Sequence, residues 1–197
     1  MISFVLAVLF LLITPGPGVL SLAGVGAAYG YRAGARYLVG LFLGTNLVCL
    51  MVITGLAALM LAEPRIRIVL TLASAAYLLW LASRIALAGT RLAFIERPTA
   101  PGIRDGILLQ IINPKAYVVN TTLFSGFAFL AARPAVEMAI KLLVLNAMWV
   151  SIHVLWLWIG VSVRRLNLAE RTQRRINIGM ALAMLAVVAL ATLAPQS

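Results

Sequence analysis

The stretch LLITPGPGVLSLAG, residues 11–24, places two prolines and three glycines inside an apolar run that otherwise has the character of a membrane-spanning helix. Proline has no N–H to donate, and its ring crowds the carbonyl four residues earlier. Pro15 and Pro17 are therefore expected to free the carbonyl groups of Leu11 and Ile13. Because hydrocarbon offers these groups no water as a partner, the sequence predicts a helix that breaks partway across a membrane.

The whole chain is far more apolar than a water-soluble domain. Of its 197 residues, 63% are hydrophobic and 11% are charged, whereas soluble domains are about 45–50% apolar and about 25% charged. A soluble fold of this size could not hide so much apolar surface. The composition therefore predicts an integral protein of the cell (inner) membrane, and the single cysteine, Cys49, excludes a disulfide within the chain.

Six apolar segments have the roughly 17–25 residues that a helix needs to cross a bilayer. They are too long and too uniformly apolar for barrel strands. The sequence predicts an all-α, multi-pass protein with six transmembrane helices over about residues 2–27, 37–61, 68–87, 106–131, 140–163 and 176–194. These helices form a single transmembrane domain that covers residues 1–197.

The basic residues are distributed unevenly between these segments. The net charge of +11 comes from 16 Lys and Arg against five Asp and Glu, an excess that in a soluble protein would favour nucleic acid. Here 11 of the 16 lie in the first, third and fifth connections, and four, including Lys141, lie in the second and fourth. The positive-inside rule then predicts cytoplasmic odd connections, with both termini outside the cytoplasm. The partners expected for these charges are anionic lipid headgroups at the cytoplasmic loops, and not nucleic acid.

The two halves of the chain carry matching features. Ile13-Thr14-Pro15-Gly16 parallels Ile112-Asn113-Pro114-Lys115 at an offset of 99 residues, and Asn46 parallels Asn146 at an offset of 100. Since each half holds three spans, the second half enters the membrane from the opposite side. The sequence therefore predicts two inverted three-helix repeats, about residues 1–90 and 100–197, with broken helices 1 and 4. This arrangement is typical of secondary transporters.

A break of this kind exposes backbone groups that a solute can use. Beyond the first break, a new half-helix begins with unpaired N–H groups near Gly16, Gly18 and Val19. Such a helix end carries partial positive charge and suits a carboxylate. The alternative is a structural proline kink, which is common in membrane helices. Two breaks at matching positions, one beside a lysine, favour the solute site.

Two segments together resemble the lysine exporter (LysE/RhtB) family of amino-acid efflux proteins. They are ITPGPGVLSLAGVGAAYGYRAGARYLVGLFLG, residues 13–44, and RDGILLQIINPKAYVV, residues 104–119. LASAAYLLWLASRIAL, residues 72–87, is similar to the third span of that family, and the resemblance covers nearly the whole chain. The family usually has Asn where this chain has Gly18. The resemblance implies export of amino acids or related small amines and acids, driven by the proton gradient.

The expected site lies between the two breaks. The substrate-binding candidates are Thr14, Pro15, Gly16, Pro17, Gly18, Asn46, Asn113, Pro114, Lys115 and Asn146. Lys115 is a cation within a span and could meet a substrate carboxylate, or it could extend to an interface. Thr14 and Asn113 could instead satisfy the freed backbone groups. Asn46 and Asn146 could face each other at the site or simply join two helices.

Coupling to protons needs a titratable group, and the candidates are Lys115, Asp105 and His153. Asp105 is equally an ordinary helix N-cap, and His153 could be a neutral packing residue. Gly40 and Gly44 suit close helix contact within the fold or between subunits, which leaves a homo-oligomer as an alternative.

The function expected from these features is proton-coupled export of a small molecule by alternating access. The alternatives are a channel, an exporter of a non-amino-acid solute and a non-transporting scaffold. An enzyme is not expected, because the sequence shows neither a His or acid pair at metal-binding spacing nor a Ser-His-Asp set. No catalytic residue, metal or cofactor is therefore expected.

Overall fold

The computed structural model describes residues 1–14, 16–86 and 99–166, together with 171–172, 174–179, 182–183 and 186. All regular elements of this described part are helices, and no strand occurs in it. The main helices are α1 (Ile2–Ile13), α2 (Pro17–Tyr29), α3 (Tyr31–Ile53), α4 (Leu56–Ala62), α5 (Pro64–Ala86), α6 (Ile103–Ile112), α7 (Pro114–Ser125) and α8 (Pro134–Arg165).

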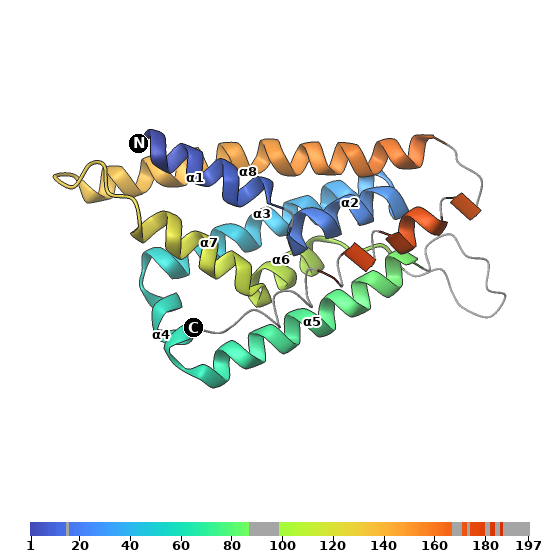
Figure 1. Ribbon diagram of the computed structural model, residues 1–197, viewed down its shortest axis with the longest axis horizontal. Coiled ribbons are helices and arrows are strands. Elements are labelled where there is room, and N and C mark those ends of the chain that lie inside the picture. The colour runs from blue at the N-terminus through green and yellow to red at the C-terminus, as the bar shows by residue number, and fades with distance from the viewer. Residues whose placement is uncertain are drawn as a thin grey trace.

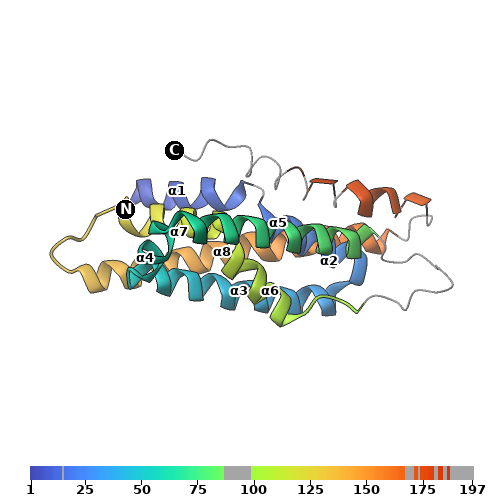
Figure 2. The same ribbon diagram turned by 90° about the horizontal axis from the view of Figure 1, so that it is seen from below.

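The helices form an elongated bundle (Figures 1 and 2), and α8 runs along one edge of it in the view of Figure 1. The two short helices α1 and α2 follow one another along α8, and both contact it. The other two half-length helices, α6 and α7, follow one another along α3, which also contacts α2 and α8. The central helix α3 therefore joins the two rows of broken helices.

The two expected breaks are present in the fold. α1 and α2 meet at an angle of 49°, and α6 gives way to α7 at Asn113. Three helices of the described part, α3, α5 and α8, are long and apolar enough to cross a membrane, and the bent α1–α2 pair makes up to four. The expected second span differs: its helix begins at Tyr31 and ends at Ile53, because Gly55 with φ +77° interrupts it before α4. The expected sixth span, residues 176–194, lies largely outside the described residues.

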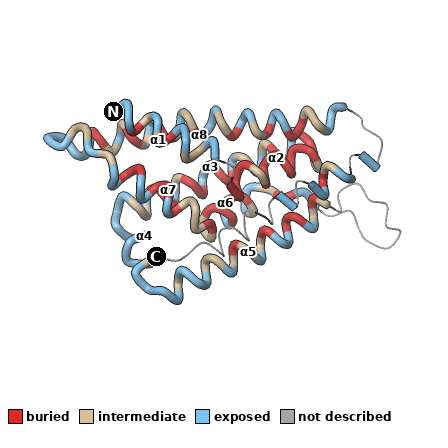
Figure 3. The backbone as a smooth tube through the Cα atoms, viewed as in Figure 1, coloured by how far each residue is buried: buried red, intermediate tan, exposed pale blue. Residues whose placement is uncertain are grey.

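The long helices carry many exposed residues (Figure 3), and several of these are large apolar residues. On α8, Leu143 is 72% exposed and Trp158 is 61% exposed, and on α5 Leu72 is 62% exposed. In water these surfaces would be unfavourable, whereas lipid tails accommodate them. The outward faces of the bundle thus agree with a membrane location.

Glycines bring pairs of helices into direct backbone contact. A Cβ at Gly40 would lie 2.1 Å from the Ile103 carbonyl oxygen, and one at Gly44 would lie 3.0 Å from that of Ile107. The small-residue spacing of α3 therefore serves the contact with α6 within the fold. Gly160 plays the same part between α8 and α2, where a Cβ would lie 2.2 Å from the Ala23 carbonyl oxygen.

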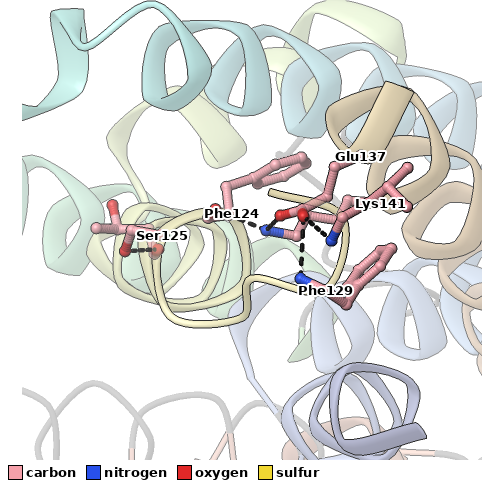
Figure 4. A network of polar contacts seen from close by, with 7 residues as sticks. Phe124, Ser125, Phe129, Glu137 and Lys141 are labelled. Atoms are coloured by element: carbon pink, nitrogen blue, oxygen red, sulfur yellow. Dashed lines mark hydrogen bonds and ion pairs between the residues drawn. The ribbon is translucent and has the colours of Figure 1, made fainter. Parts of the chain in front are cut away.

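A buried ion pair fastens the α7–α8 connection to the start of α8 (Figure 4). Lys141 Nζ lies 2.8 Å from Glu137 Oε1 and donates to the Phe124 carbonyl oxygen at 3.0 Å. The Glu137 carboxylate also accepts the backbone N–H of Phe129 at 2.9 Å and that of Leu130. The sequence count treated Lys141 as a loop charge that reports topology. That interpretation was wrong, because Lys141 is 1% exposed inside α8, where its ammonium is neutralised by Glu137.

Candidate functional site

The two helix breaks have the same construction. Pro17 is the first residue of α2 and follows Gly16, and Pro114 is the first residue of α7 and follows Asn113. Proline suits this position, because its missing N–H is one that the helix leaves unpaired anyway. Asn113 caps α7 by accepting the Lys115 backbone N–H at 3.1 Å, whereas Gly16 has no side chain with which to cap α2. The N-terminus of α2 therefore keeps its partial positive charge without a side-chain cap.

Lys115 connects the two breaks directly. Its Nζ donates to the Thr14 carbonyl oxygen at 2.8 Å, across 101 residues of sequence. The side chain lies against Gly16, where a Cβ would be 2.9 Å from Lys115 Cδ and 3.0 Å from its Nζ. Among the described residues, the one ion pair joins Lys141 and Glu137, so Lys115 has no carboxylate partner there. A partly buried cation without an anion is costly at such a site.

A chain of polar contacts extends from this break to α3. Asn113 Nδ2 donates to Gln110 Oε1 at 3.2 Å, and Gln110 Nε2 donates to Thr45 Oγ1 at 2.8 Å. All three side chains are buried. Because these bonds hold the amide of Gln110 in a fixed orientation, the polar surface at this level is preorganised.

His153 of α8 is a further polar side chain at this site. Together with Thr45, Gln110 and Asn113 it forms what we call the polar layer. Its Nδ1 lies 2.9 Å from the Trp149 carbonyl oxygen, and its ring stacks on that of Trp149 with centroids 3.5 Å apart and an interplanar angle of 14°. A Cβ at Gly18 would lie 3.6 Å from His153 Nε2 and 3.5 Å from Gln110 Nε2. Gly18 therefore leaves space between α2 and these two nitrogens.

These groups line one cavity of about 60 Å³, formed by six helices. It is lined by Leu11, Leu12, Thr14, Gly16, Pro17, Gly18, Val19, Thr45, Gln110, Asn113, Lys115, Ala116, Val119, Asn120, Leu145, Trp149 and His153. Leu145 and Val119 belong to an apolar cluster that includes Phe4, and Trp149 belongs to a second cluster with Leu22. The polar layer thus lies between two apolar clusters and has room for a small solute.

The cavity contains most of the residues expected from the breaks. Of the substrate candidates, Thr14, Gly16, Pro17, Gly18, Asn113 and Lys115 line it, as does His153 from the proton-coupling candidates. Pro114 starts α7 without lining the cavity, and Pro15 lies outside the described residues.

The remaining candidates lie away from the cavity lining. Asn46 and Asn146 bond to each other through both amides. Asp105 is on the first turn of α6, where Oδ2 accepts the Gly102 backbone N–H at 2.8 Å. This contact is a helix-capping interaction, although the N-cap residue is Gly102.

Four cavity residues with hydrogen-bonding side chains were not singled out from the sequence: Thr45, Gln110, Asn120 and Trp149. Gln110, Asn113 and Asn120 follow one another at intervals of three and seven residues within an apolar segment. That spacing places polar groups on one face of a helix and could have identified Gln110 and Asn120. Within the described part of the chain, no three His, Cys, Asp or Glu residues gather in a way that could hold a metal ion.

Comparisons with known proteins identify a family of translocators and several efflux proteins that are similar to this chain. The LysE type translocator family matches residues 9–194. A cysteine/O-acetylserine efflux protein of Escherichia coli O1:K1 is 30% identical over 171 residues, covering 86% of this chain and 85% of the relative. No solved structure matches the chain.

Two further relatives match over shorter lengths. An uncharacterized membrane protein of Pseudomonas aeruginosa is 31% identical over 134 residues, covering 64% of this chain and 62% of the relative. A leucine efflux protein of Enterobacter is 25% identical over 135 residues, covering 66% of this chain and 64% of the relative. The matched region thus spans less than two thirds of these two proteins.

Proposed function

This chain belongs to the LysE type translocator family, and we propose that it is a secondary active exporter of amino acids or related small solutes across the inner membrane. The observation that carries the proposal is Lys115, a cation that joins two broken helices at a cavity and has no acidic partner among the described residues. The relatives named leucine efflux protein and cysteine/O-acetylserine efflux protein support an amino-acid substrate.

The substrate carboxylate binds between Lys115 and the N-terminus of α2. Lys115 already lies against Gly16, the residue that precedes α2. A carboxylate at this point gains both a charge-assisted hydrogen bond from the ammonium and the partial positive charge of the helix end. It would compete with the Thr14 carbonyl, which Lys115 now contacts at 2.8 Å.

The exporter has six spans arranged as two inverted repeats, about residues 1–90 and 100–197, with both termini outside the cytoplasm. The paired proline breaks and the equivalence of Asn46 and Asn146 support this arrangement. Alternating access then consists of rocking the two repeats so that the polar layer opens first to one side and then to the other. The apolar clusters around Phe4 and around Leu22 are the two closures.

Proton coupling is assigned to Lys115 and His153, because both line the cavity. Asp105 is the weaker candidate, since its carboxylate is engaged with the Gly102 backbone outside the lining. Inward movement of protons drives release of the solute. The basic odd connections contact anionic lipid, and the chain works as a monomer or as a homo-oligomer.

The test is efflux from proteoliposomes that contain the purified full chain. Vesicles are preloaded with labelled leucine, cysteine, serine or alanine, and initial rates are measured with and without a pH gradient. Saturable, gradient-dependent efflux is expected. Lys115→Ala should lower it at least tenfold, and Lys115→Arg should recover part of it, whereas the exposed Arg65→Ala is the matched control.

Three results would count against the proposal. Efflux that does not saturate and ignores the pH gradient would indicate a channel. Normal efflux by Lys115→Ala would move the site elsewhere. A failure to move any amino acid would overturn the amino-acid assignment and direct the search to other small solutes.

A further inference from the structure

Two buried nitrogens face the space that Gly18 leaves open. A Cβ on Gly18 would lie 3.5 Å from Gln110 Nε2 and 3.6 Å from His153 Nε2, with no other heavy atom outside α2 as close. Gln110 is 5% exposed and His153 is 4% exposed. All three residues line the cavity. Both nitrogens therefore border the same gap beside Gly18 in the cavity lining.

The hydrogen bonds around each nitrogen determine whether it can act as a donor or as an acceptor in the cavity. A carbonyl oxygen only accepts, so the contact of His153 Nδ1 with the Trp149 carbonyl places the proton of the neutral ring on Nδ1. Nε2 then carries a lone pair and is an acceptor. The amide nitrogen of Gln110 has two hydrogens, and Thr45 takes one of them. The space above Gly18 is consequently flanked by one free donor and one free acceptor.

Neither group is satisfied elsewhere in the described part of the chain. His153 Nε2 forms no hydrogen bond to a described residue, and the second N–H of Gln110 forms none either. Both side chains are also held in place, His153 by the stacked Trp149 ring and Gln110 by Asn113 and Thr45. A fixed donor and a fixed acceptor that converge on an open space call for a group able to accept and donate at once.

We propose that the space above Gly18 is the side-chain subsite of the transported solute, and that it takes a hydroxyl or thiol group. The oxygen or sulfur accepts from Gln110 Nε2, and its hydrogen is donated to His153 Nε2. An aliphatic side chain would leave both nitrogens unpaired. The inference rests on the proposed export function and names the class of substrate, an amino acid with a short hydroxyl- or thiol-bearing side chain.

The position of the subsite along α2 sets the length of that side chain. Gly16 faces the ammonium of Lys115, and Gly18 faces Gln110 and His153. Gly16 is the extended residue that precedes α2, and Gly18 is the second residue of that helix, so their Cα atoms are at most about 7 Å apart. This short separation between the carboxylate end and the hydroxyl end suits a short side chain.

The experiment compares matched pairs of solutes in proteoliposomes of the full chain. L-serine is compared with L-alanine, and L-cysteine with L-2-aminobutyrate, so that each pair differs by the hydroxyl or thiol group. The wild-type protein should export the first member of each pair about tenfold faster at limiting concentration, because the second leaves two buried groups unpaired.

Two variants test whether the preference for serine over alanine arises at Gly18 and His153. Gly18→Ala adds a methyl group at ordinary contact distance from both nitrogens, and it should bring the serine-to-alanine ratio close to one. His153→Phe keeps a ring against Trp149 but removes Nε2, and it should lower the same ratio. Gly179→Ala, with nothing within 4 Å of the added Cβ, is the control and should keep the wild-type ratio.

Any of the following outcomes would overturn the inference. Equal wild-type rates for both members of each pair would mean that water or nothing occupies the space, while the exporter itself stands. A strong preference that Gly18→Ala and His153→Phe both leave unchanged would place the hydroxyl subsite elsewhere. A lack of efflux for all four solutes while leucine is exported would overturn the inference alone. A lack of efflux for leucine as well would overturn the proposed amino-acid export, and the inference with it.

Discussion

Asn46 of α3 and Asn146 of α8 donate a hydrogen bond to each other, and both bonds measure 3.0 Å. The two residues are 100 positions apart in a chain of 197, so they occupy matching places in the two halves. Each amide supplies one donor and one acceptor to an identical group. This symmetry is what a pseudo-two-fold axis between inverted repeats would produce.

Removing the side-chain amide of Asn46 or of Asn146 should lower the free energy of unfolding about as much as removing both amides. Asn46→Leu or Asn146→Leu breaks both bonds at once, with an expected loss of about 1–2 kcal/mol in the free energy of unfolding. The double variant should be no less stable than the single ones, because no amide is then left unpaired. Unfolding of purified protein in detergent micelles measures this cycle, and strictly additive losses would contradict the pairing.

Lys115 should lower stability while it supports transport. Replacing it by Met keeps much of its length and removes the charge, so the free energy of unfolding should rise by about 1 kcal/mol or more. Efflux should fall at least tenfold, because the substrate carboxylate loses its partner. The two readouts are the melting temperature in detergent and initial efflux rates, with Arg65→Met on the exposed surface as the control. A less stable Lys115→Met protein would indicate that the lysine is structural.

Replacing one partner of the ion pair at the start of α8 should cost much more stability than replacing the other. Glu137→Gln leaves the buried Lys141 ammonium without a countercharge among the described residues, and an expected loss of about 3–5 kcal/mol follows. Lys141→Met should cost less, because Glu137 keeps the backbone N–H groups of Phe129 and Leu130. The Glu137→Gln/Lys141→Met protein should recover much of the loss. Urea unfolding in micelles orders the three variants, and equal losses for both single changes would contradict this account.

Gly40 should not accept even one methyl group. A Cβ there would lie 2.1 Å from the Ile103 carbonyl oxygen, which is backbone and cannot swing aside. Gly40→Ala should therefore destabilise the protein by about 1–3 kcal/mol through separation of α3 and α6. Gly179→Ala, which has open space around it, should be neutral or gain up to about 1 kcal/mol. Melting temperatures in detergent compare the pair, and similar values would mean that the helices adjust freely.

Local chemistry explains which parts of the fold and site could be predicted. The breaks at Gly16–Pro17 and Asn113–Pro114 follow from proline itself, which acts on carbonyl groups within the same turn. The lysine and histidine in the cavity were identifiable because charge and polarity are rare in apolar spans. Lys141 was misassigned because a count of basic residues between spans ignores the carboxylate of Glu137, one helical turn earlier, which neutralises it.

The sequence by itself determined the helical membrane class, the two breaks and the matching asparagines, because apolar run length and proline geometry act over a few residues. Only the tertiary structure decided that the glycines of α3 meet α6, that Lys115 reaches the Thr14 carbonyl and that Gln110 and His153 converge above Gly18. These contacts join residues far apart in the chain. They depend on how each helix is rotated and shifted against its neighbours. The periodicity of apolar residues indicates which face of a helix is buried, but not which helix packs against that face.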